Sequence, residues 1–410
     1  MKKLLTLVII FMATALSSCK SDDSDVLSDV LSIVHVSKGG TLASVLTESG
    51  LDASQLVSLK ISGILNAEDF MTIRNMNALI NLDISEVEIT ALPEKAFFGS
   101  VNIRHLILPR NLMTIGEKMF YNSGLESIVI PIGVETIETS AFYACSSLRT
   151  VTFEEGSQLK TIDGGYNGTT YCGAFTGCTS LISIEIPASV ETIGQAAFKN
   201  CSKLASVTFE EGSQLKTIDG DFGDGTGAFS DCTSLTSIEI PASVEIIGKA
   251  AFKGCSKLAN VTFEEGSQLK TIDVKAFYHC TSLTSIEIPA SVETIGQAAF
   301  KNCSKLASVT FEEGSQLKTI VDDAFSDCVN LMTVDMSECT QVESIMYDAF
   351  SNNSKLQLFK IGTKRPPKCY DRAFDGIHPY SILKVPSGWM EYYRRADGWN
   401  SFANIEELTE

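Results

Sequence analysis

Phenylalanine recurs along this chain at a nearly constant interval, and this period constrains the fold more than any other feature. Twelve phenylalanines, most of them in an Ala-Phe pair, follow one another at steps of 22–33 residues: Phe97, Phe120, Phe142, Phe175, Phe198, Phe229, Phe252, Phe277, Phe300, Phe325, Phe350 and Phe374. A period in the twenties is typical of a solenoid, in which each unit buries its apolar side only against its neighbours. The period therefore predicts a long scaffold with a regular surface, which favours binding over catalysis.

One unit, at residues 181–203, shows how the repeat is built. Ile184 and Ile186 alternate with Ser183 and Glu185, which indicates a short strand with one buried face. Pro187 ends this strand, because proline has no amide hydrogen to donate to a ladder. The alternation predicts that serine and glutamate face solvent while the isoleucines face the core.

The next unit keeps the same frame but has a longer turn, Glu-Glu-Gly-Ser at residues 210–213. Units of 23 and 25 residues alternate in this way and form a two-unit block. The block that starts at Cys178 recurs almost verbatim at Cys232 and Cys280. Such self-similarity indicates duplication of one block, so most of the turns are copies of one another.

The pattern Ile-Gly followed by Ala-Phe-x-x-Cys, as at residues 193–201, resembles the leucine-rich repeat of BspA-like surface proteins of gut and oral anaerobes. The resemblance covers about residues 90–375. It implies a β-rich α/β solenoid, curved and right-handed, with a parallel sheet on the concave face and loops and short helical turns on the convex face. Members of the family are often cell-surface lipoproteins associated with adhesion to host proteins or other cells.

The same resemblance divides the chain into five segments. We expect a lipoprotein signal peptide at 1–18, an acidic tether at 19–30, an N-terminal cap at 31–89, about twelve repeats at 90–375 and a C-terminal cap at 376–410. Caps are needed because an open solenoid end would expose core and strand edge.

Each cap contains its own signal. Asn66 with Asp69 three residues later predicts the start of a helix in the N-terminal cap. Four aromatic residues mark the C-terminal cap: Trp389, Tyr392, Tyr393 and Trp399. Two interpretations of these four stay open, the core of the cap or a stacking platform for a sugar.

The first residues read as an export signal. Lys2 and Lys3 precede an apolar run of 13 residues at 4–16, which is too short to span a bilayer comfortably. Leu-Ser-Ser-Cys at 16–19 resembles a bacterial lipobox, which implies cleavage before Cys19 and lipidation of its thiol. We therefore expect a lipid-anchored outer-membrane lipoprotein, exposed on the surface of a Gram-negative bacterium. An ordinary signal peptide with a chance cysteine is the alternative.

The charge of the chain excludes one class of partner. The net charge is −18 and the isoelectric point is near 4.7, whereas nucleic-acid binding needs clustered lysine and arginine. Glutamates of the long turns supply much of this charge, at Glu154, Glu210, Glu264 and Glu312. They indicate either solubility alone, or a cationic partner or divalent ions that bridge the surface.

Cysteine usage points to the core. Eight of the twelve cysteines stand three residues after a repeat phenylalanine: Cys145, Cys178, Cys201, Cys232, Cys255, Cys280, Cys303 and Cys328. Equivalent residues of stacked units point the same way, and buried cysteine behaves as a small hydrophobe. The position predicts a ladder of reduced thiols rather than disulfides. Cys172, Cys339 and Cys369 lie off this register.

No catalytic or metal-binding motif is present, so we expect neither enzyme activity, nor a cofactor, nor a metal site. The four histidines lie in unrelated contexts, and the nucleophile-elbow, phosphate-loop and metalloprotease patterns are missing from the sequence. The abundant carboxylates are repeated copies, whereas catalysis needs one unique constellation.

Two insertions break the period, at residues 163–173 and 219–227. Insertions in solenoids usually form loops on one face, so the aromatic residues Tyr166, Tyr171 and Phe222 are possible loop contacts. Asp219, Asp221 and Asp224 have the wrong spacing for a calcium loop. Neutral drift of the loop lengths is the alternative explanation.

The candidate binding surface consists of the strand positions between inward residues: Ser183, Glu185, Ser206, Thr208, Ser237, Glu239, Asn260, Thr262, Ser285, Glu287, Ser308 and Thr310. Every second unit would present a glutamate, ~9.6 Å from the next. This surface suits a protein partner with spaced cations or hydrogen-bond donors. A glycan-capture lipoprotein and a display spacer without a ligand are the alternatives.

Overall fold

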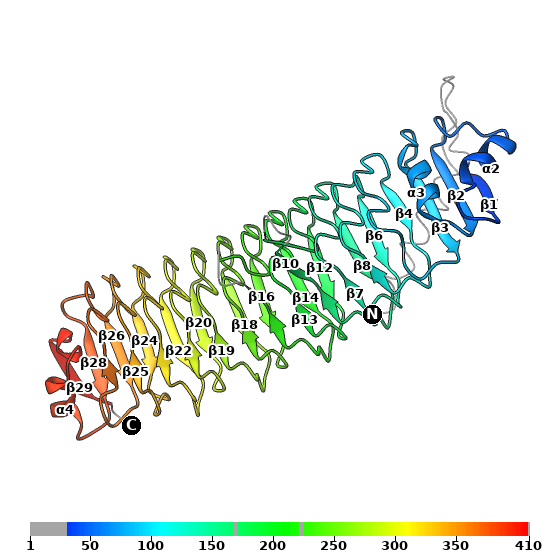
Figure 1. Cartoon of the computed structure of the whole chain (residues 1–410). Coiled ribbons are helices and arrows are strands. Elements are labelled where there is room, and N and C mark those ends of the chain that lie inside the picture. Colours follow the sequence, from blue (N-terminus) through cyan, green and yellow to red (C-terminus); the bar gives the residue numbers. More distant parts are fainter. Residues whose placement is uncertain (1–30, 167–170, 221–224, 409–410) are drawn as a thin grey trace, which may run out of the picture.

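The structure, a computed structural model, describes residues 31–166, 171–220 and 225–408. These residues form an elongated solenoid in which the chain coils repeatedly around one apolar core (Figure 1). Strands of successive coils pair in parallel, as the sequence predicts, so the solenoid fold class is confirmed.

One side of every coil carries the strand that the alternation of isoleucine with serine and glutamate predicts. Ten of these strands form one sheet: β1 (Ser32–Val36), β2 (Ser58–Gly63), β3 (Asn81–Val87), β4 (His105–Ile107), β6 (Ser127–Ile130), β8 (Thr150–Phe153), β12 (Ser183–Ile186), β14 (Ser206–Phe209), β16 (Ser237–Ile240) and β18 (Asn260–Phe263). Six form a second sheet: β20 (Ser285–Ile288), β22 (Ser308–Phe311), β24 (Thr333–Met336), β26 (Leu358–Ile361), β28 (Ile382–Val385) and β29 (Asn404–Glu407). Thr284 donates its backbone N–H to Ala259 across the junction, so the two sheets continue one face, called here the strand face.

A further parallel sheet lines a second side of the coils, where the family resemblance implied loops and short helical turns. Its eleven strands have two residues each: β5 (Thr114–Ile115), β7 (Thr136–Ile137), β9 (Thr161–Ile162), β13 (Thr192–Ile193), β15 (Thr217–Ile218), β17 (Ile246–Ile247), β19 (Thr271–Ile272), β21 (Thr294–Ile295), β23 (Thr319–Ile320), β25 (Ser344–Ile345) and β27 (Lys368–Cys369). A two-residue strand shows no alternation, so its pairing depends on the stacking of neighbouring coils.

Helices occur only near the two ends of the described chain. The helices α2 (Leu42–Glu48) and α3 (Ala67–Arg74) lie near the N-terminal end, whereas α4 (Met390–Arg395) and the 3-10 turn η1 (Trp399–Ser401) lie near the other. The predicted start of α3 is confirmed, because Asn66 accepts from the backbone of Asp69 and Asp69 accepts from the backbone of Asn66.

The repeat phenylalanines form a continuous stack through the core. All twelve are buried, and neighbouring rings of the column lie nearly parallel, with centroids between 4.9 Å and 5.6 Å apart. Stacked rings at this distance attract one another and fill the space between adjacent coils. The phenylalanine period of the sequence is therefore the period of the coil.

The backbone turns sharply on both sides of most rings. In ten of the twelve coils the residues two before and two after the phenylalanine have positive φ, such as Ala250 and Gly254 around Phe252, or Lys275 and His279 around Phe277. Glycine, asparagine, aspartate and histidine tolerate this conformation best. His279 thus occupies a position selected for backbone conformation, which asparagine, aspartate or glycine takes in most other coils.

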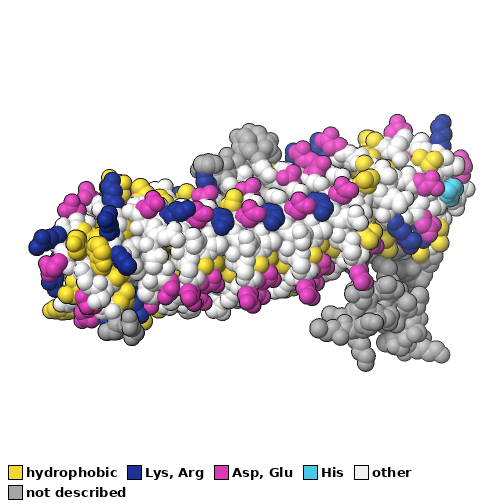
Figure 2. Space-filling view, turned by 90° about the horizontal axis from the view of Figure 1, so that it is seen from below, with side chains coloured by type: hydrophobic (Ala, Val, Ile, Leu, Met, Phe, Trp, Pro, Cys, Tyr) yellow, Lys and Arg dark blue, Asp and Glu magenta, His cyan; other side chains and the backbone are white. Residues whose placement is uncertain are grey.

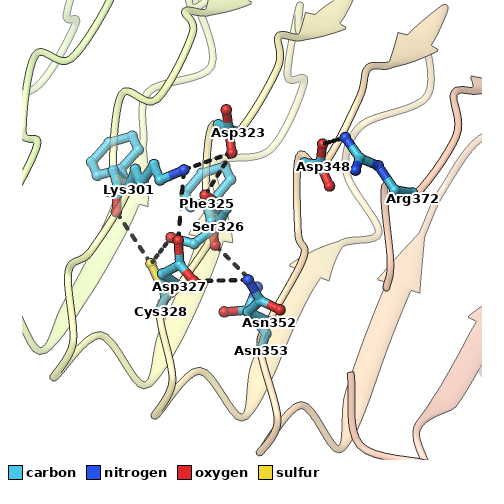
Figure 3. Close-up of polar contacts among 11 residues, drawn as sticks. Lys301, Asp323, Phe325, Ser326, Asp327, Cys328, Asp348, Asn352, Asn353 and Arg372 are labelled. Carbon is cyan, nitrogen blue, oxygen red and sulfur yellow. Dashed lines mark hydrogen bonds and ion pairs between the residues drawn. The ribbon is translucent and has the colours of Figure 1, made fainter. Parts of the chain in front are cut away.

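The cysteine ladder is confirmed, and it has a hydrogen-bonding role that the sequence analysis did not predict. Cys328, for example, is buried and donates its thiol hydrogen to the carbonyl oxygen of Phe300 in the preceding coil, at 3.2 Å (Figure 3). The other seven ladder thiols make the equivalent bond. Asn353 takes the place of cysteine in the next coil and donates to Phe325 at 3.0 Å.

The C-terminal aromatic residues divide between core and surface. Trp399 and Tyr393 are fully buried, and the Trp399 indole N–H donates to the carbonyl oxygen of Pro367 at 3.0 Å. Trp389 is half-buried, and its ring lies 4.7 Å from that of Tyr392, which is 59% exposed. The interpretation as core is confirmed for two of the four.

Candidate binding surface

The strand face carries the twelve side chains that define the candidate surface. Ten of them are exposed, whereas Ser308 and Thr310 on β22 are half-buried. The register places Glu185 beside Thr208, Glu239 beside Thr262, and Glu287 beside Thr310. Each pair of neighbouring strands thus presents one carboxylate and one hydroxyl in the same row.

The three glutamates of this row have no polar partner among the described residues. On the C-terminal side, in contrast, Asp335 of β24 pairs with Lys360 of β26 at 2.7 Å. Burial raises the pKa of Asp335, but its hydrogen bonds to Lys360 and Ser337 outweigh burial and hold that pKa below its ordinary value. Carboxylates without an ion-pair partner therefore occur in the central coils of this row.

Two strands on the N-terminal side of this row carry an apolar side chain, before the row continues with Asp83 and Lys60. Ile107 on β4 and Val129 on β6 are 39% and 42% exposed and occupy the outward position that glutamate takes further along. The sequence analysis missed these residues. An apolar residue at the outward position of an alternating strand was the available signal.

A ladder of alternating charges runs beside the second sheet. The residue directly before nine of the eleven short strands alternates in sign from coil to coil: Glu135, Lys160, Glu191, Lys216, Glu245, Lys270, Glu293, Lys318 and Glu343. Ion pairs link three sets of neighbours, the shortest between Lys318 and Glu293 at 2.6 Å. This bond raises the pKa of Lys318 and lowers that of Glu293. Dark-blue and magenta side chains alternate along the body of the molecule in Figure 2, and five glutamates against four lysines leave this row nearly balanced in charge.

The glutamates of the long turns form a third row, at the corner that follows the strand face. Glu264 accepts a hydrogen bond from the backbone N–H of Ala242 in the preceding coil at 2.9 Å, and Glu154, Glu210 and Glu312 do the same in their coils. These carboxylates therefore support the turn of their neighbour, in addition to providing charge. The adjacent Glu155, Glu211, Glu265 and Glu313 are exposed.

The two insertions form short antiparallel contacts at their bases. In the first, β10 (Gly164–Tyr166) pairs with β11 (Tyr171–Gly173), so Tyr166 and Tyr171 are backbone partners. In the second, Gly220 and Gly227 form one bridge. Phe222, Asp221 and Asp224 lie outside the described residues. Within residues 31–166, 171–220 and 225–408, no group of three acidic, cysteine or histidine side chains could hold a metal ion.

Seven of the eight ladder cysteines, all except Cys145, are poorly suited to act as nucleophiles, because burial raises their pKa. Burial raises the pKa of Cys201 and of Cys303 to about 12, and both are inaccessible to solvent. A thiol must ionise to react, so these groups stay inert near neutral pH.

The proposed lipidation site, Cys19, lies outside the described residues. In the part of the chain that the structure does describe, none of the helices combines the length and the apolar composition needed to span a membrane.

Comparison with known proteins identifies the repeat. The family model described as BspA type leucine rich repeat region matches residues 68–166, 168–223 and 224–357 in six copies. A leucine-rich repeat protein from Bacteroides ovatus aligns over 86% of this chain and 84% of its own, with a TM-score of 0.59 and 23% identity.

Two further solved structures are similar with lower scores. The pneumococcal vaccine antigen PcpA aligns over 73% of this chain and 85% of its own, with a TM-score of 0.43 and 21% identity. A leucine-rich repeat protein from Eubacterium ventriosum aligns over 80% and 84%, with a TM-score of 0.41 and 21% identity. No curated protein matches the chain.

Proposed function

Because the chain belongs to the BspA-type leucine-rich repeat family, we propose that it is a lipid-anchored cell-surface protein that binds a macromolecule on its strand face. The partner is a protein segment with spaced basic side chains, and its capture serves adhesion to a host or microbial surface. The protein is a binding scaffold and not an enzyme.

The observation that carries this proposal is the row of unpaired carboxylates on the strand face. Glu185, Glu239 and Glu287 stand on every second strand, and the strands between them carry threonine in the same row. Parallel strands lie about 4.8 Å apart, so the carboxylates repeat at ~9.6 Å. A row of like charges attracts an extended cationic segment at low ionic strength, and salt screens this attraction.

The test is binding of a soluble fragment from residue 26 onward to arrays of matrix proteins and glycans. The Glu185→Gln, Glu239→Gln, Glu287→Gln triple variant should fold normally and bind the array ligand more weakly, with a smaller dependence on salt. The matched control changes Glu155, Glu211 and Glu265 to glutamine, which removes the same charge from the corner. If both triple variants lose affinity equally, the strand face is not the site.

The glycan alternative predicts a different result. Burial of Trp399 and Tyr393 leaves Trp389 and Tyr392 as the accessible aromatic pair of that end. Glycan capture would be favoured if the protein bound a glycan, if Tyr392→Ala abolished this binding, and if the glutamate variants left it intact. A display spacer would bind nothing on either array.

The anchor is proposed on the lipobox at residues 16–19. Cys19→Ser should prevent lipidation and cleavage, so the protein should no longer partition into the detergent phase. Unchanged partitioning of Cys19→Ser would contradict a lipid on this residue.

A further inference from the structure

The C-terminal end of the solenoid has the opposite charge to the rest of the chain. Residues 355–395 contain nine lysine and arginine residues and three acidic ones, and residues 396–410 add four acidic ones, so this end is slightly positive whereas the whole chain carries −18. Dark-blue side chains gather at this end in Figure 2, while magenta side chains recur along the body. An anion approaching the molecule is therefore repelled along the body and attracted at this end.

An open groove of about 340 Å³ lies at this end, between the turns that follow β24 and β26. Thr340 and Gln341 line it from one coil, and Lys364 and Arg365 line it from the next. None of the residues that line the groove is acidic. Residues that carry hydroxyl, amide, ammonium and guanidinium groups thus line a space of the size that small ligands occupy.

Lys364 and Arg365 have no partner among the described residues, whereas three other cations close in sequence do. Lys360 pairs with Asp335 at 2.7 Å, and Arg372 pairs with Asp348 at 2.6 Å (Figure 3). Lys368 lies over the ring of Tyr370, 4.1 Å from its centroid. The two groove cations are therefore available to an external anion, and both are exposed.

The turn that carries these cations is held in place from several directions. The Gly362 N–H donates to Met336, and the Thr363 carbonyl accepts from the buried hydroxyl of Tyr393 at 2.8 Å. Pro367 accepts from the Trp399 indole. Pro366 directly follows Arg365 and restricts its backbone to extended conformations. A fixed turn loses little conformational entropy when a ligand binds.

We propose that this groove binds an anionic group of monosaccharide size, a sugar that carries a phosphate or a carboxylate. Lys364 and Arg365 bind the anion through charge-assisted hydrogen bonds, and Thr340 and Gln341 contact the hydroxyl groups of the sugar. This site is separate from the strand face and selects the opposite charge, so it does not depend on the binding function proposed above.

The experiment titrates the full-length protein with glucose 6-phosphate, glucuronate, inorganic phosphate and glucose, with calorimetry or ligand-observed NMR as the readout. The Lys364→Gln, Arg365→Gln variant should bind the anionic sugars about tenfold more weakly or not at all. Lys203→Gln, Lys257→Gln is the matched control, because it removes two exposed cations elsewhere and should bind as the unmodified chain does.

The three probes besides the sugar phosphate separate the possible sources of binding. Preference for glucose 6-phosphate or for glucuronate identifies which anion the groove selects, and either supports the proposal. Inorganic phosphate binding as tightly as the sugar anions would overturn the role of Thr340 and Gln341. Equal binding of glucose, no saturable binding of any anion, or equal loss in the control variant would overturn the site itself.

Discussion

The thiol of Cys255 donates a hydrogen bond to the main-chain carbonyl oxygen of Phe229, the aromatic residue of the preceding coil, over 3.2 Å. The ring of Phe229 itself stacks on that of Phe252, three residues before Cys255, at 5.4 Å. Each coil thus contacts its neighbour through a stacked ring and a thiol that pairs a buried carbonyl. The Phe229 carbonyl also accepts the backbone N–H of Cys232 at 3.2 Å, so the thiol is its second donor.

Replacing Cys255 should show how much its thiol hydrogen bond contributes to stability. We expect Cys255→Ala to lower the free energy of unfolding by about 0.5–1.5 kcal/mol, because the Phe229 carbonyl loses one of its two donors and keeps the backbone N–H of Cys232. Cys255→Ser keeps a donor and should cost less. Urea unfolding followed by circular dichroism measures both, and an equal loss in the two variants would contradict the donor role.

Truncating a phenylalanine of the stacked column should destabilise the fold more than truncating a ladder cysteine. Phe252→Ala removes a fully buried ring and leaves a cavity between two stacked neighbours, so we expect a loss of about 3–5 kcal/mol. The exposed Lys257 two residues after the ladder cysteine is the control, and Lys257→Ala should change stability little. A loss under about 1 kcal/mol in denaturant melts for Phe252→Ala would mean that the ring is not essential to the core.

Serine occupies the ladder position in the first coils, and there the packing is incomplete. The Ser100 hydroxyl is buried without a hydrogen-bond partner among the described residues, and the void beside it has no room for a water molecule. Ser100→Cys should therefore raise the unfolding free energy by about 1 kcal/mol, since a larger, less polar group fills the void. Ser100→Ala removes the hydroxyl without filling the void, and should gain less. A lower melting temperature for Ser100→Cys would show that the site cannot accept sulfur.

The turn glutamates should contribute modestly to stability. Glu264→Ala removes the acceptor for the Ala242 N–H, and we expect a loss of about 0.5–1 kcal/mol because the bond is exposed to solvent. Glu265→Ala, at the neighbouring exposed position, is the control and should be neutral. Equal melting temperatures for the two variants would assign Glu264 to solubility alone.

The buried thiols predict loss of stability at alkaline pH. In the unfolded chain Cys201 ionises at its ordinary pKa of 9.0, whereas burial raises its pKa to about 12 in the fold. The unfolded state thus loses its proton first, so this contribution is complete below pH 9 and decreases as the pH rises toward 12. Each such thiol should cost on the order of 1 kcal/mol per pH unit in this range. Melting temperatures measured between pH 8 and 11 should fall, and substitution of Cys201 by alanine should flatten the decrease. A curve unchanged by that substitution would show that the thiol is not responsible.

The sequence alone determined the coil, because the features that specify it are local and repeated. The regular spacing of the repeat phenylalanines from Phe97 to Phe374 set the length of one coil. The alternation of polar and apolar residues around Ile184 set which side chains face inward. Twelve copies of one pattern leave few alternatives for how the coils stack. The burial of the thiol ladder followed from the same register.

The tertiary structure decided the features that join residues of different coils. The short strand Thr192–Ile193 exists because its neighbours in the coils before and after donate and accept hydrogen bonds, which no local pattern reveals. The carboxylate of Glu264 finds a backbone partner 22 residues away, whereas Glu265 beside it finds none among the described residues. The groove of Lys364 and Arg365 forms only when two adjacent turns meet. Hydrogen-bond pairing, side-chain exposure and grooves depend on the distances between residues of neighbouring coils. Those distances become defined only once the chain has folded.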